Sequence, residues 1–119
     1  MNRTVLIIED DTAIAAVMQA ILEAEGYEVL HAVDGDGFAA ALAAQPTLIF
    51  LDINMPGMDG PEVSHYLRAH PRTAHIPIIA MSAQGRPPVL PPHMQADDYL
   101  AKPFEVDDLC QKVERWVQP

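Results

Sequence analysis

The most constraining feature of the sequence is an apolar run that ends in a carboxylate and then turns. Residues 48–51 are four large apolar side chains, a pattern typical of a strand that is buried on both faces. Asp52 follows at once, and the Pro-Gly and Asp-Gly steps within 56–60 predict that the chain then turns. A carboxylate at the end of a buried strand is costly unless it is paired or binds a cation. Asp52 therefore needs a chemical explanation.

Strand and helix patterns alternate along the rest of the chain. Apolar runs predict strands at 5–8, 27–33, 47–51, 76–81 and 99–101. Amphipathic or alanine-rich stretches predict helices at 12–25, 37–44, 61–69 and 103–116. This order predicts a parallel sheet that is covered by helices on both faces, with functional groups beyond the carboxyl ends of the strands.

The helical patterns also predict which side chains point inward. Val17 in the first helix, Tyr66 in the third and Val106 in the last fall on the predicted apolar faces. Asp11 or Thr12 is suited to cap the start of the first helix. These predictions define the faces that should meet the sheet.

Length, charge and cysteine content narrow the functional class. The 119 residues suffice for one core and show no linker, so residues 1–119 are expected to form one domain. A formal charge of −10 argues against direct nucleic-acid binding, which needs a basic surface. The single cysteine, Cys110, favours a reducing compartment, so the cytoplasm is the expected location. No apolar run approaches the length of a membrane span, and no secretion signal opens the chain.

The polar residues at the predicted strand ends form one candidate site, and they are Glu9, Asp10, Asp52, Ser82 and Lys102. Converging carboxylates repel one another and require a cation, and oxygen ligands without histidine or thiol favour Mg²⁺ or Mn²⁺. A lysine and a hydroxyl can hold a phosphoryl oxygen, and a carboxylate can act as a nucleophile. These residues predict a phosphorylatable aspartate with Mg²⁺ support.

Four segments, each at the end of a predicted strand, occur in order at 5–11, 51–60, 81–83 and 97–104. Together they resemble the receiver domain of two-component response regulators, and the match covers nearly the whole chain. The resemblance implies a flavodoxin-like, doubly wound α/β/α fold with five parallel strands in the order 2-1-3-4-5. It also implies a histidine kinase or histidine phosphotransfer protein as the phosphodonor, and a conformational switch that controls a partner. Catalysis would be limited to self-catalysed phosphorylation and dephosphorylation.

The resemblance assigns roles to the residues that carry it. Asp52 would accept the phosphoryl group, and Lys102 and Ser82 would contact it. Ala83 would leave access to the phosphoryl group, and Tyr99 would be the aromatic residue whose rotamer accompanies switching. For Tyr99, plain packing in a strand remains an alternative.

The resemblance also implies how the cation would be held. Asp10 and Asp52 would bind Mg²⁺ directly, together with the backbone carbonyl of Asn54. Glu9 would act through a water molecule. Asp11 is expected to serve as a helix cap instead.

Residues 83–96 depart from the family pattern. Four prolines lie within 87–92, and a helix interior does not accommodate them because each removes a backbone hydrogen bond. The fourth helix of typical receivers is therefore expected to be missing or severely shortened by the segment 86–92. Output through the face that this helix normally builds, including a homodimer, is left open.

Two alternative functions follow from the same residues. The first is a phosphorylation-independent interaction module that keeps the receiver fold and signals through 83–96. The second is a hydrolase of the haloacid dehalogenase type, which is weaker because that class wants an acid where Asn54 stands. Transfer of phosphate to Asp52 separates the leading interpretation from the first alternative.

Overall fold

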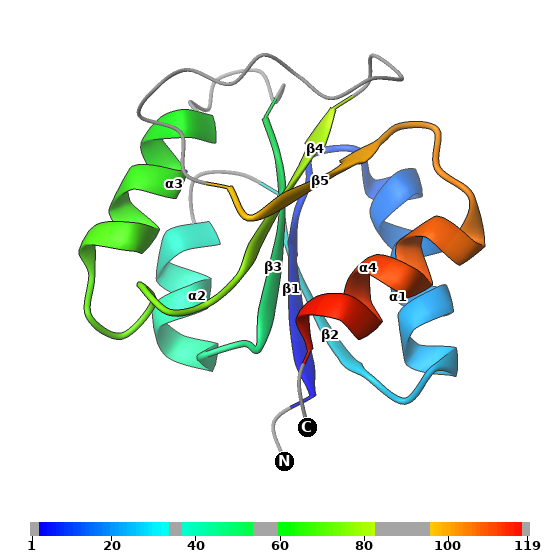
Figure 1. The fold of residues 1–119 in the computed structure, drawn as a ribbon, viewed down its shortest axis with the longest axis horizontal. Helices are drawn as coiled ribbons and strands as arrows, with labels where there is room; N and C mark the ends of the chain where they lie inside the picture. Colours follow the sequence, from blue (N-terminus) through cyan, green and yellow to red (C-terminus); the bar gives the residue numbers. More distant parts are fainter. Residues whose placement is uncertain (1–2, 34–36, 54–59, 83–95, 118–119) are drawn as a thin grey trace.

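Five short strands form one parallel sheet in the order β2-β1-β3-β4-β5 (Figure 1). The structure is a computed structural model, and it describes residues 3–33, 37–53, 60–82 and 96–117. The strands are β1 Thr4–Ile8, β2 Glu28–Ala32, β3 Leu48–Asp52, β4 Ile78–Ser82 and β5 Asp98–Ala101. The helices in these ranges are α1 Thr12–Ala24, α2 Gly37–Ala44, α3 Gly60–Ala69 and α4 Val106–Trp116. Of these helices, none combines the length and apolar character that a membrane crossing requires.

The strand order confirms the predicted doubly wound sheet. Every residue of β3 and β4 is buried, as is all of β1 after Thr4. These strands lie inside the sheet, where each face must be covered, and their continuous apolar runs fit that position. The registers Ile8↔Leu51 and Asp52↔Met81 bring the carboxyl ends of the three strands to one edge.

Helices cover both faces of the sheet, with α1 and α4 on one side and α2 and α3 on the other (Figure 1). Because side chains alternate along a strand, Ile7 and Phe50 join the core beneath α1 and α4. Their neighbours Ile8 and Leu51 join the core against α2 and α3. The molecule therefore has the expected three layers.

Three predicted inward positions are wrong. Val17, Tyr66 and Val106 are 55%, 49% and 54% exposed. The buried stripe of α1 runs through Met18 and Leu22, and a residue next to such a stripe is turned about 100° away from it. Tyr66 is likewise displaced by its buried neighbour Leu67, and Val106 is the first residue of its helix.

The start of the last helix also differs from the prediction. A helix opened by Pro103 was expected, but α4 begins at Val106 with Glu105 in the capping position. Residues 102–105 instead form a connection with bends and coil after β5. Lys102 therefore follows the end of β5 directly and is not part of the helix.

Asp98 anchors α4 to the edge of the sheet. Its carboxylate accepts hydrogen bonds from Lys112 Nζ at 2.8 Å and from Trp116 Nε1 at 2.9 Å. It also accepts one from the backbone N–H of Tyr99 at 2.8 Å. Burial alone would raise the pKa of Asp98, but these donors outweigh it and hold the pKa below its usual value. Trp116 also packs against the core beneath α1 and α4.

The prediction for the proline-containing segment lies outside the described residues, which resume at 96 after 82. The label α4 belongs to the C-terminal helix, Val106–Trp116, and not to a helix between β4 and β5. A missing or shortened helix over 86–92 therefore stays a prediction.

Candidate functional site

Three carboxylates meet at the carboxyl ends of β1 and β3. Glu9 and Asp10 follow β1 directly, and Asp52 is the last residue of β3. One oxygen from each side chain lies within 4.8 Å of the other two. Glu9 and Asp52 are only 0% and 3% exposed, whereas Asp10 is open to solvent. The predicted convergence of these acids is confirmed.

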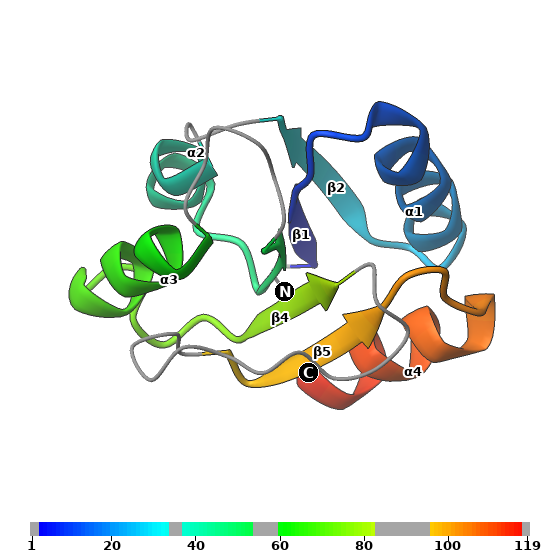
Figure 2. The same ribbon diagram turned by 90° about the horizontal axis from the view of Figure 1, so that it is seen from above.

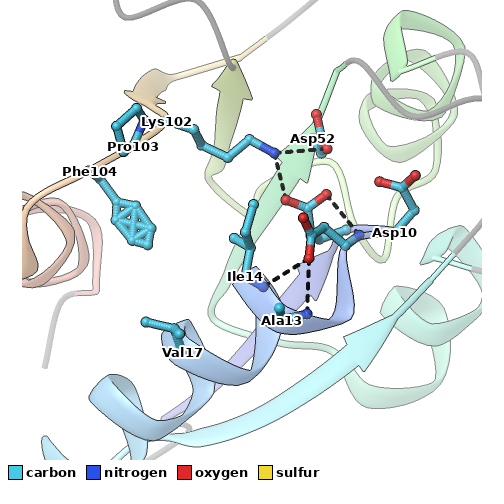
Figure 3. Close-up of a pocket in the computed structure, with 10 residues that line it drawn as sticks. Asp10, Ala13, Ile14, Val17, Asp52, Lys102, Pro103 and Phe104 are labelled. Carbon is cyan, nitrogen blue, oxygen red and sulfur yellow. Dashed lines mark hydrogen bonds and ion pairs between the residues drawn. The ribbon is translucent and has the colours of Figure 1, made fainter.

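Lys102 completes this cluster from the end of β5. Its Nζ lies 2.6 Å from Glu9 Oε1 and 3.1 Å from Asp52 Oδ2 (Figure 3). Its backbone N–H donates to the carbonyl of Ser82 at 2.6 Å, which ties the ends of β4 and β5 together. Burial alone would lower the pKa of Lys102, but the bonds to both carboxylates raise it. Lys102 is therefore a full positive charge at neutral pH.

One ammonium does not neutralise two buried carboxylates. Burial, followed by the hydrogen bond with Asp52, raises the pKa of Glu9 to about 7, and Lys102 offsets this only in part. With Asp10 included, the cluster carries three carboxyl groups against one lysine. The negative charge of the site therefore exceeds its positive charge, and a bound divalent cation would compensate the difference.

Asp11 has a different role from its two acidic neighbours. Its Oδ1 accepts from the backbone N–H groups of Ala13 at 3.0 Å and Ile14 at 3.2 Å. These are the hydrogen bonds of a helix N-cap, so Asp11, and not Thr12, caps α1. The backbone N–H of Asp11 is also 3.5 Å from Glu9 Oε2. Because the Asp11 carboxylate is bound to the start of the helix, it is Asp10 that contributes a carboxylate to the cluster.

A groove of about 730 Å³ opens over the cluster. The acids and Lys102 line one part of it, and Ile14, Val17 and Phe104 line another (Figure 3). Sequence reasoning missed this apolar wall, although Ile14 and Val17 are three residues apart and hence neighbours on α1. The exposure of Val17 is explained by its place on this wall.

Of the other predicted site residues, the structure describes Ser82 and Tyr99. Ser82 is buried at the end of β4, one residue beyond Met81, the register partner of Asp52. Tyr99 is partly buried on β5. Asn54 and Ala83 lie outside the described residues, so their predicted roles stay predictions.

Sequence reasoning also missed a histidine beside the cluster. His31 Nε2 lies 2.6 Å from the carbonyl oxygen of Glu9. The available signal was its place near the end of the second predicted strand, which should lie beside the first.

The donor set fits a hard divalent cation. Carboxylate oxygens are the ligands that Mg²⁺ prefers, and it commonly binds through one or two of them with water completing the shell. Three carboxyl groups within 4.8 Å and an unneutralised negative charge meet that requirement.

Comparison with protein families gives the assignment. The family model described as the response regulator receiver domain matches residues 5–114. The chain belongs to this family. Of the described residues in the four segments that carry the resemblance, Asp10, Asp52, Ser82 and Lys102 lie together at one edge of the sheet.

Individual relatives agree with this assignment. The receiver is 43% identical over 115 residues to the DNA-binding dual master transcriptional regulator RpaA of Synechocystis sp.. The alignment covers 92% of this chain and 46% of RpaA. It is 35% identical over 113 residues to the phosphate regulon transcriptional regulatory protein PhoB of Rhizobium meliloti, covering 92% of this chain and 50% of PhoB. The chain therefore spans about half the length of these two relatives.

One similar solved structure contains a metal ion. The receiver domain of the sensor histidine kinase PA1611 from Pseudomonas aeruginosa PAO1 has a TM-score of 0.85 and 28% identity, covering 98% of both chains. That crystal structure has a magnesium ion coordinated in its active site cleft. The receiver described here has an acidic cluster of the type that such an ion requires.

Proposed function

We propose that this receiver accepts a phosphoryl group on Asp52 from a histidine kinase or a histidine phosphotransfer protein, with residues 1–119 acting as one unit. One observation carries the proposal. The buried Asp52 carboxylate lies 3.1 Å from Lys102 Nζ, which it shares with Glu9, and within 4.8 Å of two further carboxylates. A purely structural carboxylate would be neutralised by its partner, whereas this one lies in a cluster with excess negative charge.

In such a transfer the protein contributes mainly the positioning of the reacting groups and the electrostatic stabilisation of the transition state. An oxygen of Asp52 forms a bond to phosphorus while the bond from phosphorus to the histidine nitrogen of the donor breaks. The product is an acyl phosphate on Asp52, and the donor histidine leaves with the electron pair of the broken bond. Lys102 is already within hydrogen-bonding distance of the accepting carboxylate and would pair with the phosphoryl oxygens.

Asp10 and Asp52, with the backbone carbonyl of Asn54, would hold Mg²⁺ directly, and Glu9 would hold it through water. The bound ion would supply positive charge to the phosphoryl oxygens during transfer. The magnesium ion in the PA1611 receiver supports this part of the proposal. Mn²⁺ suits the same oxygen ligands.

The phosphoryl group would also switch the domain. It adds a charge of about −1.5 to −2, which attracts Lys102 and a hydrogen bond from Ser82 on the neighbouring strand end. Ala83 would leave room for the group, and Tyr99 would change rotamer as the strand ends adjust. Because the chain carries a formal charge of −10, the partner that reads this switch is proposed to be a protein and not nucleic acid.

Transfer of labelled phosphate from a small phosphodonor tests the proposal. With Mg²⁺ present, wild-type protein should become labelled, and Asp52→Asn should not. Asp98→Asn is the matched control, since it removes a partly buried carboxylate from the α4 anchor, and it should still be labelled. Wild-type protein that stays unlabelled would favour the phosphorylation-independent interaction module instead.

A further inference from the structure

His31 lies on the strand next to the one that carries the acids. Figure 2 shows β2 beside β1, and the register pairs His31 with Ile7, two residues before Glu9. The ring reaches forward along β1, and its Nε2 lies 2.6 Å from the carbonyl oxygen of Glu9. A carbonyl oxygen only accepts, so Nε2 carries the proton and donates it.

This hydrogen bond continues the pairing of β1 with β2 beyond the end of the strand. The backbone N–H of Glu9 donates to the carbonyl of Ala32 at 3.0 Å. The strand β1 ends at Ile8, and it is the His31 side chain that holds the next polar group, the Glu9 carbonyl. Both backbone polar groups of Glu9 are therefore bound to β2, one by its main chain and one by His31.

The Glu9 carbonyl belongs to the same planar peptide unit as the amide nitrogen and Cα of Asp10. A hydrogen bond that fixes this plane also fixes the direction in which the Asp10 side chain leaves the backbone. On the other side of Asp10, the Asp11 cap holds the chain to the start of α1. Asp10 itself is exposed, so its place in the cluster depends on the backbone that flanks it.

We propose that His31 is a positioning residue that holds the Asp10 carboxylate at the strand-end cluster. The inference rests on the proposed function, in which that cluster binds a divalent cation. His31 acts through the Glu9–Asp10 peptide, and the ligands remain the carboxylates. Groups that orient metal ligands without touching the metal typically change affinity by about 10- to 100-fold. Because His31 acts through one peptide plane, we expect the lower end of this range.

The test compares three variants at this position by the binding of Mn²⁺, followed by the paramagnetic resonance of the free ion. His31→Phe keeps a ring but removes the donor, His31→Ala removes both, and His31→Gln restores an N–H donor. His31→Phe and His31→Ala should weaken Mn²⁺ binding about tenfold, and His31→Gln should return to within about twofold of wild type. Leu30→Ala, on the same strand, controls for unspecific effects on β2.

Two further measurements separate positioning from stability. The urea unfolding midpoints of the three His31 variants should lie close to that of wild type, because the His31 side chain is exposed. In metal-free protein, the amide resonance of Asp10 should shift in His31→Phe and recover in His31→Gln.

The outcomes distinguish the two proposals. Saturable Mn²⁺ binding by wild type together with equal binding by His31→Phe would overturn the role of His31 alone. A His31→Gln variant as weak as His31→Phe would also overturn it, since the donor would then be irrelevant. Wild-type protein without saturable binding would overturn the cation site itself, and the inference with it.

Discussion

Two clusters that combine carboxylates with lysine lie in the described part of the receiver, and their ratios of negative to positive charge differ. At the strand ends, Lys102 is shared by the buried Glu9 and Asp52, with Asp10 close by. At the sheet edge, the single carboxylate of Asp98 is surrounded by Lys112, Trp116 and a backbone N–H, with Arg115 at 3.9 Å. In the first cluster the carboxylates outnumber the single ammonium that they share. In the second, three hydrogen-bond donors surround one carboxylate.

The pKa values express the same difference. Burial and a second carboxylate raise the pKa of Glu9 to about 7, whereas the donors around Asp98 lower its pKa despite burial. A satisfied carboxylate fixes one element to another, as Asp98 fixes α4 to β5. An unsatisfied set of carboxylates is suited to take up a cation or a proton. We therefore read the Asp98 cluster as structural and the strand-end cluster as functional.

The largest expected effect comes from removing the lysine of each cluster. Lys102→Ala leaves two buried carboxylates without their cation and should lower the free energy of unfolding by about 3 kcal/mol at neutral pH without metal. Lys112→Ala should cost about 1 kcal/mol, because Asp98 keeps its other donors and the pair is partly exposed. Urea denaturation measures both. Equal losses in the two variants would contradict the distinction between the clusters.

The next effect comes from removing the carboxylate at the sheet edge. Asp98→Asn weakens the hydrogen bonds from Lys112 and Trp116 and should cost about 2 kcal/mol of unfolding free energy. Trp116 is the only tryptophan, so its fluorescence reports directly on the anchor and should change in this variant. An unchanged emission spectrum with unchanged stability would show that Asp98 does not hold α4.

The pH dependence of stability should have opposite signs for the two clusters. In metal-free protein, the raised pKa of Glu9 means that its stabilising contribution is complete below about pH 4.5 and is lost as the pH rises through about 7. The lowered pKa of Asp98 means that its contribution is present above about pH 3.8 and is lost as the pH falls through its lower folded value.

Glu9→Gln should therefore flatten the decline towards neutral pH, with an effect of roughly 1 to 3 kcal/mol. Asp98→Asn should change only the acid side of the profile. Unfolding midpoints measured across pH in the presence of a chelator test both signs. A Glu9→Gln profile that still falls between about pH 4.5 and about 7 would assign the decline to another group.

The smallest expected effect concerns Cys110, which is on α4 but is a member of neither cluster. Burial, followed by the nearby carboxylates of Glu25, Glu114 and Asp107, raises the pKa of this thiol. Because the thiolate is the reactive form, alkylation of folded protein at neutral pH should be several-fold slower than after unfolding in urea. Equal rates of alkylation would show that the acidic surroundings do not protect the thiol.

Most of the fold was predictable because its signals are local. The apolar runs of β3 and β4 and the periodicity of α1 identify their elements without tertiary information. The errors at Val17, Tyr66 and Val106 arise because periodicity defines an apolar face only to within about one residue. The neighbours Met18 and Leu67 occupy the buried positions in α1 and α3.

The residues of the site were predictable from the sequence, but the hydrogen bonds between them were not. The parallel sheet brings Asp10, Asp52, Ser82 and Lys102 to one edge, so the order of strand ends sufficed to find them. The sharing of Lys102 between Glu9 and Asp52 depends on side-chain reach across β4, which sequence does not encode locally. The bond from His31 to the Glu9 carbonyl depends on the register of β1 and β2 and was missed for the same reason.

A titration with Mg²⁺ followed by amide resonances tests the central claim most directly, because it observes both clusters in one experiment. We predict one saturable site, with shifts at residues 9, 10, 52 and 102 and constant resonances at 98, 112 and 116. Shifts that do not saturate, or that spread evenly over the acidic residues of both clusters, would contradict it.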